Sequence, residues 1–144
     1  MKSQIEFVRA KPKDIKGSGG VGQMTADYNT LIKAFGNPHD CTKEGPWKSG
    51  DNKVRAEWAF KSVDNGEPIV ITIYDYKQSK TPVTEVTDWS IGLKGDIQIA
   101  ASFLVSRLGR YCFKTHRIVL VEKRLNTGST IMMSAEAVEK IGDC

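Results

Sequence analysis

Two runs of alternating apolar residues decide the fold of this chain: KVRAEWAFKS at residues 53–62 and PIVITIYDYK at residues 68–77. In the first run every second side chain is apolar, which is the period of a strand with one buried face. The second run is rich in the β-branched and aromatic residues that favour strands. Between them, Asp64-Asn65-Gly66 is a turn signal. The two runs are therefore predicted to pair as an antiparallel hairpin.

Apolar residues with a helical period lie on both sides of this hairpin. The upstream set, at i, i+3, i+4 and i+7, consists of Tyr28, Leu31, Ile32 and Phe35. Thr25 is the expected N-cap of this helix and Gly36 its stop, and a second helix is expected between Asp96 and Gly109. Both helices should pack on the hairpin. The expected core consists of Leu31, Phe35, Trp58, Phe60, Ile71 and Ile73.

The remaining segments predict short strands and loops. Strands are expected at residues 5–9 and 88–91, and residues 10–24, rich in glycine and lysine, are expected to form a flexible loop. Residues 110–144 form a C-terminal extension, in which a second hairpin is followed by a short helix starting at Ser134. The strands of that hairpin are expected at residues 116–123 and 129–133.

The order of these elements lacks the regular alternation of strand and helix that a parallel sheet requires. The predicted fold class is α+β, an antiparallel sheet of hairpins packed against two to three helices, in a single domain over residues 1–144. The chain has 144 residues, of which 40% are apolar, enough for one core. We expect a soluble, intracellular protein, because no apolar run approaches ~20 residues and the first residues lack a signal-peptide pattern. Three cysteines, an odd number, favour reduced thiols.

Positive charge is concentrated near the C-terminal end. Residues 104–124 hold six basic residues and one acidic residue, a net charge of +5 against +4 for the whole chain. If Ile118 and Leu120 face the core, the alternate residues form a mixed basic and apolar surface suited to an acidic protein partner. A solvated outer face is the alternative. The candidate partner-binding residues are Arg110, Lys114, Arg117, Val119, Val121, Lys123 and Arg124.

A second candidate surface lies at the end of the 68–77 strand. Tyr74 and Tyr76 share one face beside Lys77, an arrangement that can stack nucleic-acid bases, although burial in a second core layer is the alternative. Asp75 lies among these residues, where burial would suit acid–base chemistry; its alternative role is to cap a turn or to pair with Lys77. No nucleophile, base or carboxylate pair has a convincing spacing, so no catalytic residue is assigned.

Two further patterns are weak. The glycines of GSGGVG at residues 17–22 match a dinucleotide fingerprint, but the expected βαβ context is missing; Gly19 and Gly20 are kept as candidate ligand contacts in a loop. His39 with Cys41, and Cys112 with His116, would supply four zinc ligands. The second pair lies in a predicted strand, where residues i and i+4 are about 13 Å apart. We therefore expect neither a metal ion nor a cofactor.

An ordered set of motifs connects the first two thirds of the chain to a known group of proteins. The motifs are FGNP at residues 35–38, EWAF at 57–60, ITIYDYK at 71–77 and DWSIG at 88–92. Over residues 15–105 the chain resembles small uncharacterised proteins of tailed bacteriophages and large DNA viruses that share the FGxP, ITIYDYK and DWxIG pattern. Leu93 stands where those proteins usually have a second glycine. The resemblance implies a viral origin and an α+β fold, and it carries no catalytic residue.

These observations predict a virus-encoded, non-enzymatic binding protein that engages a host macromolecule or signalling molecule during infection. The expected partner is a protein with an acidic surface, and nucleic acid is a further candidate; no membrane is expected. The alternatives are a structural virion component, either a minor capsid or a core protein, and a nucleic-acid-binding module. The expected location is the host-cell cytoplasm or the virion.

Overall fold

The computed structural model describes residues 5–50, 52–63, 66–108, 117–123 and 130–134. In this part of the chain eight strands form one antiparallel sheet, in the order β1-β4-β5-β6-β2-β7-β8, and β3 also pairs with β4. The strands are β1 (Phe7–Arg9), β2 (Gly19–Thr25), β3 (His39–Asp40), β4 (Ala56–Ser62), β5 (Val70–Tyr74), β6 (Asp88–Lys94), β7 (Arg117–Lys123) and β8 (Thr130–Ser134).

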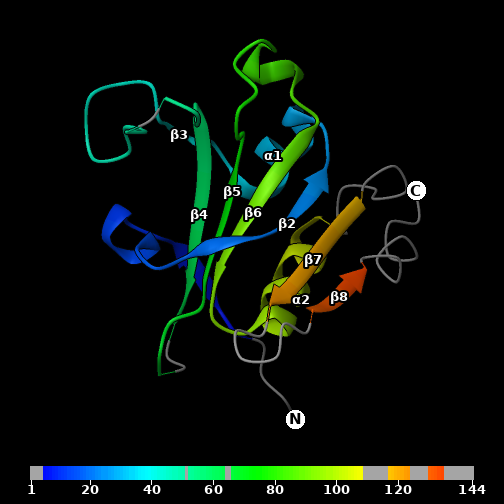
Figure 1. Ribbon diagram of the computed structural model, residues 1–144. Coiled ribbons are helices and arrows are strands. Elements are labelled where there is room, and N and C mark those ends of the chain that lie inside the picture. The colour runs from blue at the N-terminus through cyan, green and yellow to red at the C-terminus, as the bar shows by residue number, and fades with distance from the viewer. Residues whose placement is uncertain (1–4, 51, 64–65, 109–116, 124–129, 135–144) are drawn as a thin grey trace.

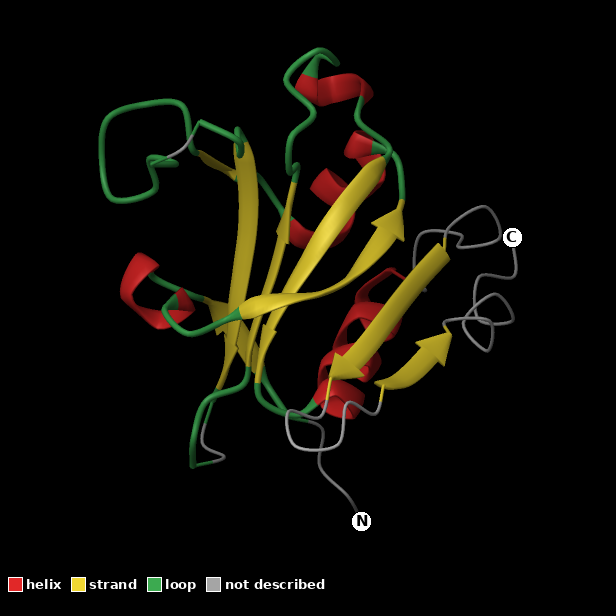
Figure 2. Cartoon of the chain, in the orientation of Figure 1, coloured by secondary structure: helices red, strands yellow, loops and turns green. Residues whose placement is uncertain are grey.

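Two α-helices, α1 (Tyr28–Phe35) and α2 (Ile97–Leu108), pack on one face of this sheet (Figure 1 and Figure 2). We call this the inner face and the opposite one the outer face. A short 3-10 helix, η1 (Pro12–Ile15), lies against β5 on the outer face, and a second, η2 (Val83–Glu85), lies near α1. The architecture confirms the predicted α+β class. Within the described residues, no helix has the length and apolarity needed to span a membrane.

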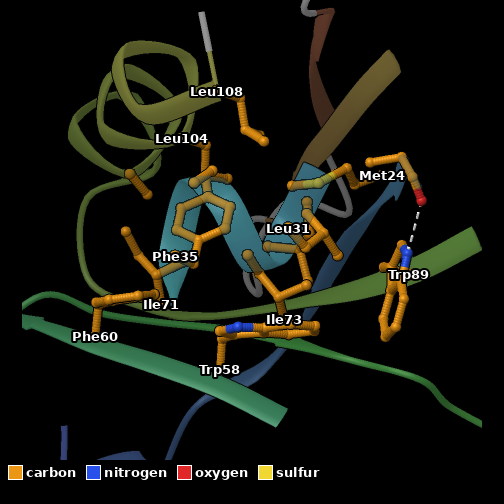
Figure 3. Close-up of a cluster of buried hydrophobic side chains, with 14 of the residues drawn as sticks. Met24, Leu31, Phe35, Trp58, Phe60, Ile71, Ile73, Trp89, Leu104 and Leu108 are labelled. Carbon is orange, nitrogen blue, oxygen red and sulfur yellow. Dashed lines mark hydrogen bonds between the residues drawn. The ribbon is translucent and has the colours of Figure 1, made fainter. Parts of the chain in front are cut away.

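The predicted hairpin is confirmed as β4 and β5. Its register pairs Trp58 with Ile73 and Phe60 with Ile71, which sets these four side chains on the inner face. They join residues from both helices in one buried cluster, so the predicted core is confirmed (Figure 3). The indole of Trp58 donates a hydrogen bond from Nε1 to the carbonyl oxygen of Gly36, at 2.8 Å, at the end of α1.

Both helices form close to their predicted positions. Helix α1 begins at Tyr28 rather than just after Thr25, because Thr25 is still paired with β6 as the last residue of β2. At its end, Gly36 adopts a left-handed conformation with φ +84°, which glycine tolerates best. The expected cap of α2 is confirmed, since Asp96 Oδ1 accepts hydrogen bonds from the backbone N–H groups of Gln98 and Ile99 at 2.8 and 3.2 Å.

The prediction of a loop over residues 10–24 is wrong for its second half, which forms β2 in the interior of the sheet. The glycine that close packing requires belongs to the neighbouring strand β6. Gly20 pairs with Gly92, and a Cβ atom on Gly92 would lie 2.3 Å from Thr72 Oγ1 and 3.5 Å from the Tyr74 ring. Strand β2 is rich in glycine and has no alternating apolar pattern, so the period of its apolar residues could not reveal it.

The C-terminal hairpin is confirmed in its two strands. Strand β7 pairs with β8 and also with β2, so this hairpin extends the same sheet. Strand β8 continues through Ser134, the expected start of the last helix, and that helix itself lies outside the described residues, as does the expected stop of α2 at Gly109.

Candidate functional site

The candidate site is a row of polar side chains across the outer face. In the ladder, Glu57 of β4 is opposite Tyr74 of β5, Tyr74 is opposite Ser90 of β6, and Ser90 is opposite Gln23 of β2. Residues directly opposite one another in an antiparallel sheet share a face. At one end His39 of β3 is opposite Glu57. The row therefore runs through five strands; from it, sequence analysis had selected Tyr74 as a binding residue and had considered His39 only as a zinc ligand.

Beside this row, residues 11–18 cross the outer face and cover the middle of the sheet. Asp14 forms an ion pair with Lys61 at 3.3 Å, and Lys94 Nζ donates a hydrogen bond to the carbonyl oxygen of Lys16 at 3.5 Å. Beneath this segment Val70 and Thr72 are buried although they belong to the outer face. The polar row borders the covered area and is half-buried to exposed.

The covering segment is basic. Its lysines and Lys94 have exposed side chains, whereas its one acidic residue, Asp14, is already paired with Lys61. We call the exposed set the lysine strip; it consists of Lys11, Lys13, Lys16 and Lys94. An exposed cluster of one sign attracts groups of the opposite charge, and attracts them more strongly at low ionic strength.

Glu57 is the most perturbed acid of the row. Burial, and to a smaller extent the charge of the nearby Asp75 carboxylate, together raise its pKa from the ordinary value of 4.5 to about 7. Among the described residues, none forms a hydrogen bond or ion pair with its carboxyl group. Near neutral pH this group is therefore divided between its charged and uncharged forms.

The Glu57→Gln variant should be more stable than the wild type above neutral pH. The folded pKa lies above the unfolded value, so ionisation opposes folding increasingly as pH rises from about 4.5 to about 7, and the cost is constant above that. Allowing for partial exposure, we expect a gain of about 2 kcal/mol in unfolding free energy at about pH 8. Urea denaturation should show little gain at about pH 4, because Glu57 is then mostly protonated in both the folded and the unfolded protein. The exposed Glu67→Gln is the control; equal profiles for the two variants would contradict the assignment.

The Tyr74 side chain lies close to Gly92 and Gly20. Its ring is 3.5 Å from the position of a Cβ on Gly92, and its hydroxyl oxygen is 3.6 Å from that of a Cβ on Gly20. Burial raises the pKa of its hydroxyl, as does the neighbouring Glu57. Tyr76, which follows β5, contacts Tyr74 edge to face with ring centroids 6.4 Å apart. The side chain of Tyr74 is half-buried, whereas Tyr76 has 41% of its surface exposed.

Asp75, the third candidate at this strand end, is fully buried and serves the fold. Its Oδ1 accepts hydrogen bonds from the backbone N–H groups of Arg55 and Ala56, and its Oδ2 pairs with Arg55 Nε at 2.8 Å. The alternative that Asp75 pairs with Lys77 is therefore wrong, because its partner is Arg55. Lys77 instead places its Nζ 5.3 Å from the centroid of the Tyr76 ring. Gly19 and Gly20 are exposed at the start of β2.

The histidine and cysteine of the zinc alternative are close together but do not form a ligand set. The Cys41 thiol is buried and contacts the carbonyl oxygen of His39 at 3.7 Å. Burial, together with the charges of Glu57, Asp75 and Asp40, raises the Cys41 pKa to about 12, so this group stays protonated. Cys112 and His116 lie outside the described residues. Within the described ranges, no three His, Cys, Asp or Glu side chains are placed to share a metal ion.

His39 has a feature that sequence analysis missed. Its ring stacks on that of Trp47 with centroids 3.8 Å apart and planes 7° from parallel. Its Nε2 is buried and has no hydrogen-bond partner in the described part of the chain. Burial lowers the pKa of His39, and so does the positive charge of Arg9, which keeps the ring uncharged near neutral pH.

The basic C-terminal strand continues the row. The register sets Val119 opposite Gln23 and Arg117 opposite Thr25, whereas Ile118 is opposite Met24, a core residue. Of the remaining candidates, Val121 and Lys123 belong to β7, and Arg110, Lys114 and Arg124 lie outside the described residues. No protein-family model, no curated protein and no solved structure matches this chain.

Proposed function

We propose that this chain is a non-enzymatic binding protein of viral origin, whose outer face docks on an acidic surface of another protein in the infected host cell. The observation that supports this proposal is the lysine strip, a set of exposed positive charges on the outer face with one acid among them, already paired. The viral origin rests on the sequence resemblance alone.

Charge in the neighbouring strands supports the same choice of partner. Strand β7 is joined to β2 and carries Arg117 and Lys123, with Val119 and Val121 at the alternate positions between them. A protein interface combines apolar contact with complementary charge, whereas duplex DNA is bound mainly through its phosphates. The acidic and thiol groups of the site also favour binding over catalysis, because Asp75 is engaged by Arg55 and Cys41 stays protonated.

The test uses charge reversal on the outer face. The protein captures partners from infected cells, and each captured protein is purified and titrated against the wild type, a Lys13→Glu, Lys16→Glu, Lys94→Glu variant, and a control. The control, Lys33→Glu, changes an exposed lysine of α1 on the inner side. We expect the triple variant to associate about tenfold more slowly at low salt with little change in dissociation, because rim charges act mainly on the association rate. The control should match the wild type.

A second variant tests the C-terminal hairpin. Arg117→Glu with Lys123→Glu should also slow association while leaving the fold intact. Full affinity after both reversals at low salt would eliminate the role of the hairpin, and full affinity of the triple variant would eliminate the lysine strip. Abundant incorporation of the protein into purified particles, measured by mass spectrometry, would instead favour a structural virion component.

A further inference from the structure

We infer that Tyr76, Lys53 and Lys77 form a separate site for single-stranded nucleic acid, in which one base stacks on Tyr76 and the two lysines bind neighbouring phosphates. Tyr76 and Val8 are the two large apolar side chains that are exposed among the described residues. Two ammonium groups lie over the Tyr76 ring, Lys77 Nζ at 5.3 Å and Lys53 Nζ at 6.0 Å from its centroid. This inference does not rest on the proposed function.

The backbone around Tyr76 is held in an uncommon conformation. Lys77 has φ +58° and Asn52 has φ +56°, both in the left-handed region that residues other than glycine rarely adopt. Such conformations persist where the surroundings hold them, and they gather at binding sites. Here the surroundings are visible: the Lys77 N–H donates a hydrogen bond to the carbonyl oxygen of Lys53 at 2.9 Å, and Arg55 Nη2 donates one to that of Gln78 at 2.8 Å.

This arrangement joins two chain segments that are distant in sequence. Asp75 fixes Arg55, Arg55 fixes the turn at Gln78, and the lysines on both segments are thereby brought to one aromatic ring. Tyr74 supports the ring of Tyr76 from its edge. A site that is fixed before its ligand arrives loses less freedom on binding.

Stacking of a base competes successfully with the lysines for the Tyr76 ring. A cation over an exposed ring changes an equilibrium by about two- to fivefold, whereas a stacked base contributes about five- to 150-fold. When a base takes their place over the ring, the two ammonium groups lie next to it, where the phosphates of a single strand pass.

The test measures binding of a short fluorescein-labelled oligothymidylate by fluorescence anisotropy, over a series of salt concentrations. The wild type should bind the single strand with a slope in log K against log salt of about −1.4, as expected for two phosphates neutralised at about 0.7 each. Tyr76→Ala should weaken binding by about tenfold with little change in this slope, and Tyr76→Trp should restore the affinity.

Lysine variants separate charge from stacking. Lys53→Gln with Lys77→Gln should abolish most of the salt dependence, whereas Lys48→Gln with Lys80→Gln, which removes two exposed lysines that do not lie over the Tyr76 ring, should leave it unchanged. Any of three results would overturn the inference: no binding by the wild type, undiminished binding by Tyr76→Ala, or equal affinity for the matched duplex. Equal competition by polyglutamate would also overturn it, because that result indicates a general attraction for anions.

Discussion

Replacing Trp58 by alanine is expected to lower the free energy of unfolding by about 3–5 kcal/mol, the largest effect that we predict for a residue of the core. The side chain is fully buried and packs edge to face against Trp89, with ring centroids 5.3 Å apart. Truncation leaves a cavity between the hairpin and α1, where Trp58 lies beside Leu31 and Phe35 (Figure 3). It also removes the hydrogen bond from Trp58 Nε1 to the carbonyl oxygen of Gly36. Urea denaturation monitored by circular dichroism measures the loss.

The control for Trp58→Ala is the same kind of truncation at an exposed aromatic residue. Tyr76→Ala also truncates an aromatic side chain, but one that is exposed, and its effect on unfolding should be below about 1 kcal/mol. A melting temperature of Trp58→Ala equal to that of the wild type would contradict the placement of Trp58 in the core.

Replacing Asp75 by alanine is expected to cost about 3 kcal/mol, because it removes the fully buried carboxylate of an ion pair whose other member, Arg55, is only 23% exposed. It also leaves the backbone N–H groups of Arg55 and Ala56 without the acceptor that they now share, at 2.7 and 2.9 Å. The loss is measured by urea denaturation near neutral pH.

The control for Asp75 is a second carboxylate that pairs with a cation near the surface. Asp14→Ala breaks the ion pair with Lys61, at 3.3 Å, and the hydrogen bond from the Lys11 N–H, and it should cost much less than Asp75→Ala because solvent screens both interactions. Asp75→Asn keeps the shape of the side chain and should fall between the two alanine variants. Equal losses for Asp75→Ala and Asp14→Ala would show that the buried pair does not hold the ends of β4 and β5 together.

The elements that the sequence predicts well are those with a local signal. The hairpin of β4 and β5 follows from an alternating pattern and a turn, and the cap at Asp96 follows from one residue type at one position. Strand β2 lacks both signals. Its pairing partners are β6 and β7, which lie far along the chain, so that no window of sequence contains the contacts that make it a strand.

The part of the candidate site that lies within one local motif was predictable from the sequence, whereas the part that depends on contacts between strands was not. Tyr74, Tyr76 and Lys77 lie within one short motif, and their residue types alone point to binding. Glu57 becomes notable only when the register sets it beside Tyr74 and burial shifts its pKa. The true partner of Asp75 is Arg55, across the hairpin, whereas the sequence offered Lys77 as the nearest cation. Contacts between strands, rather than residue types, define this site.

The position of β2 between β6 and β7 also determines the order in which the chain can fold. Within the described sheet, the C-terminal hairpin joins the other strands through β2, an element from the N-terminal part of the chain. During synthesis β2 has no partner until β6 has been made, and β7 has no place in the sheet until β2 has docked on β6. Pairings between distant segments form slowly, since a long loop must close before any contact is gained. The hairpin of β4 and β5 can form early, whereas completion of the sheet waits for nearly the whole chain.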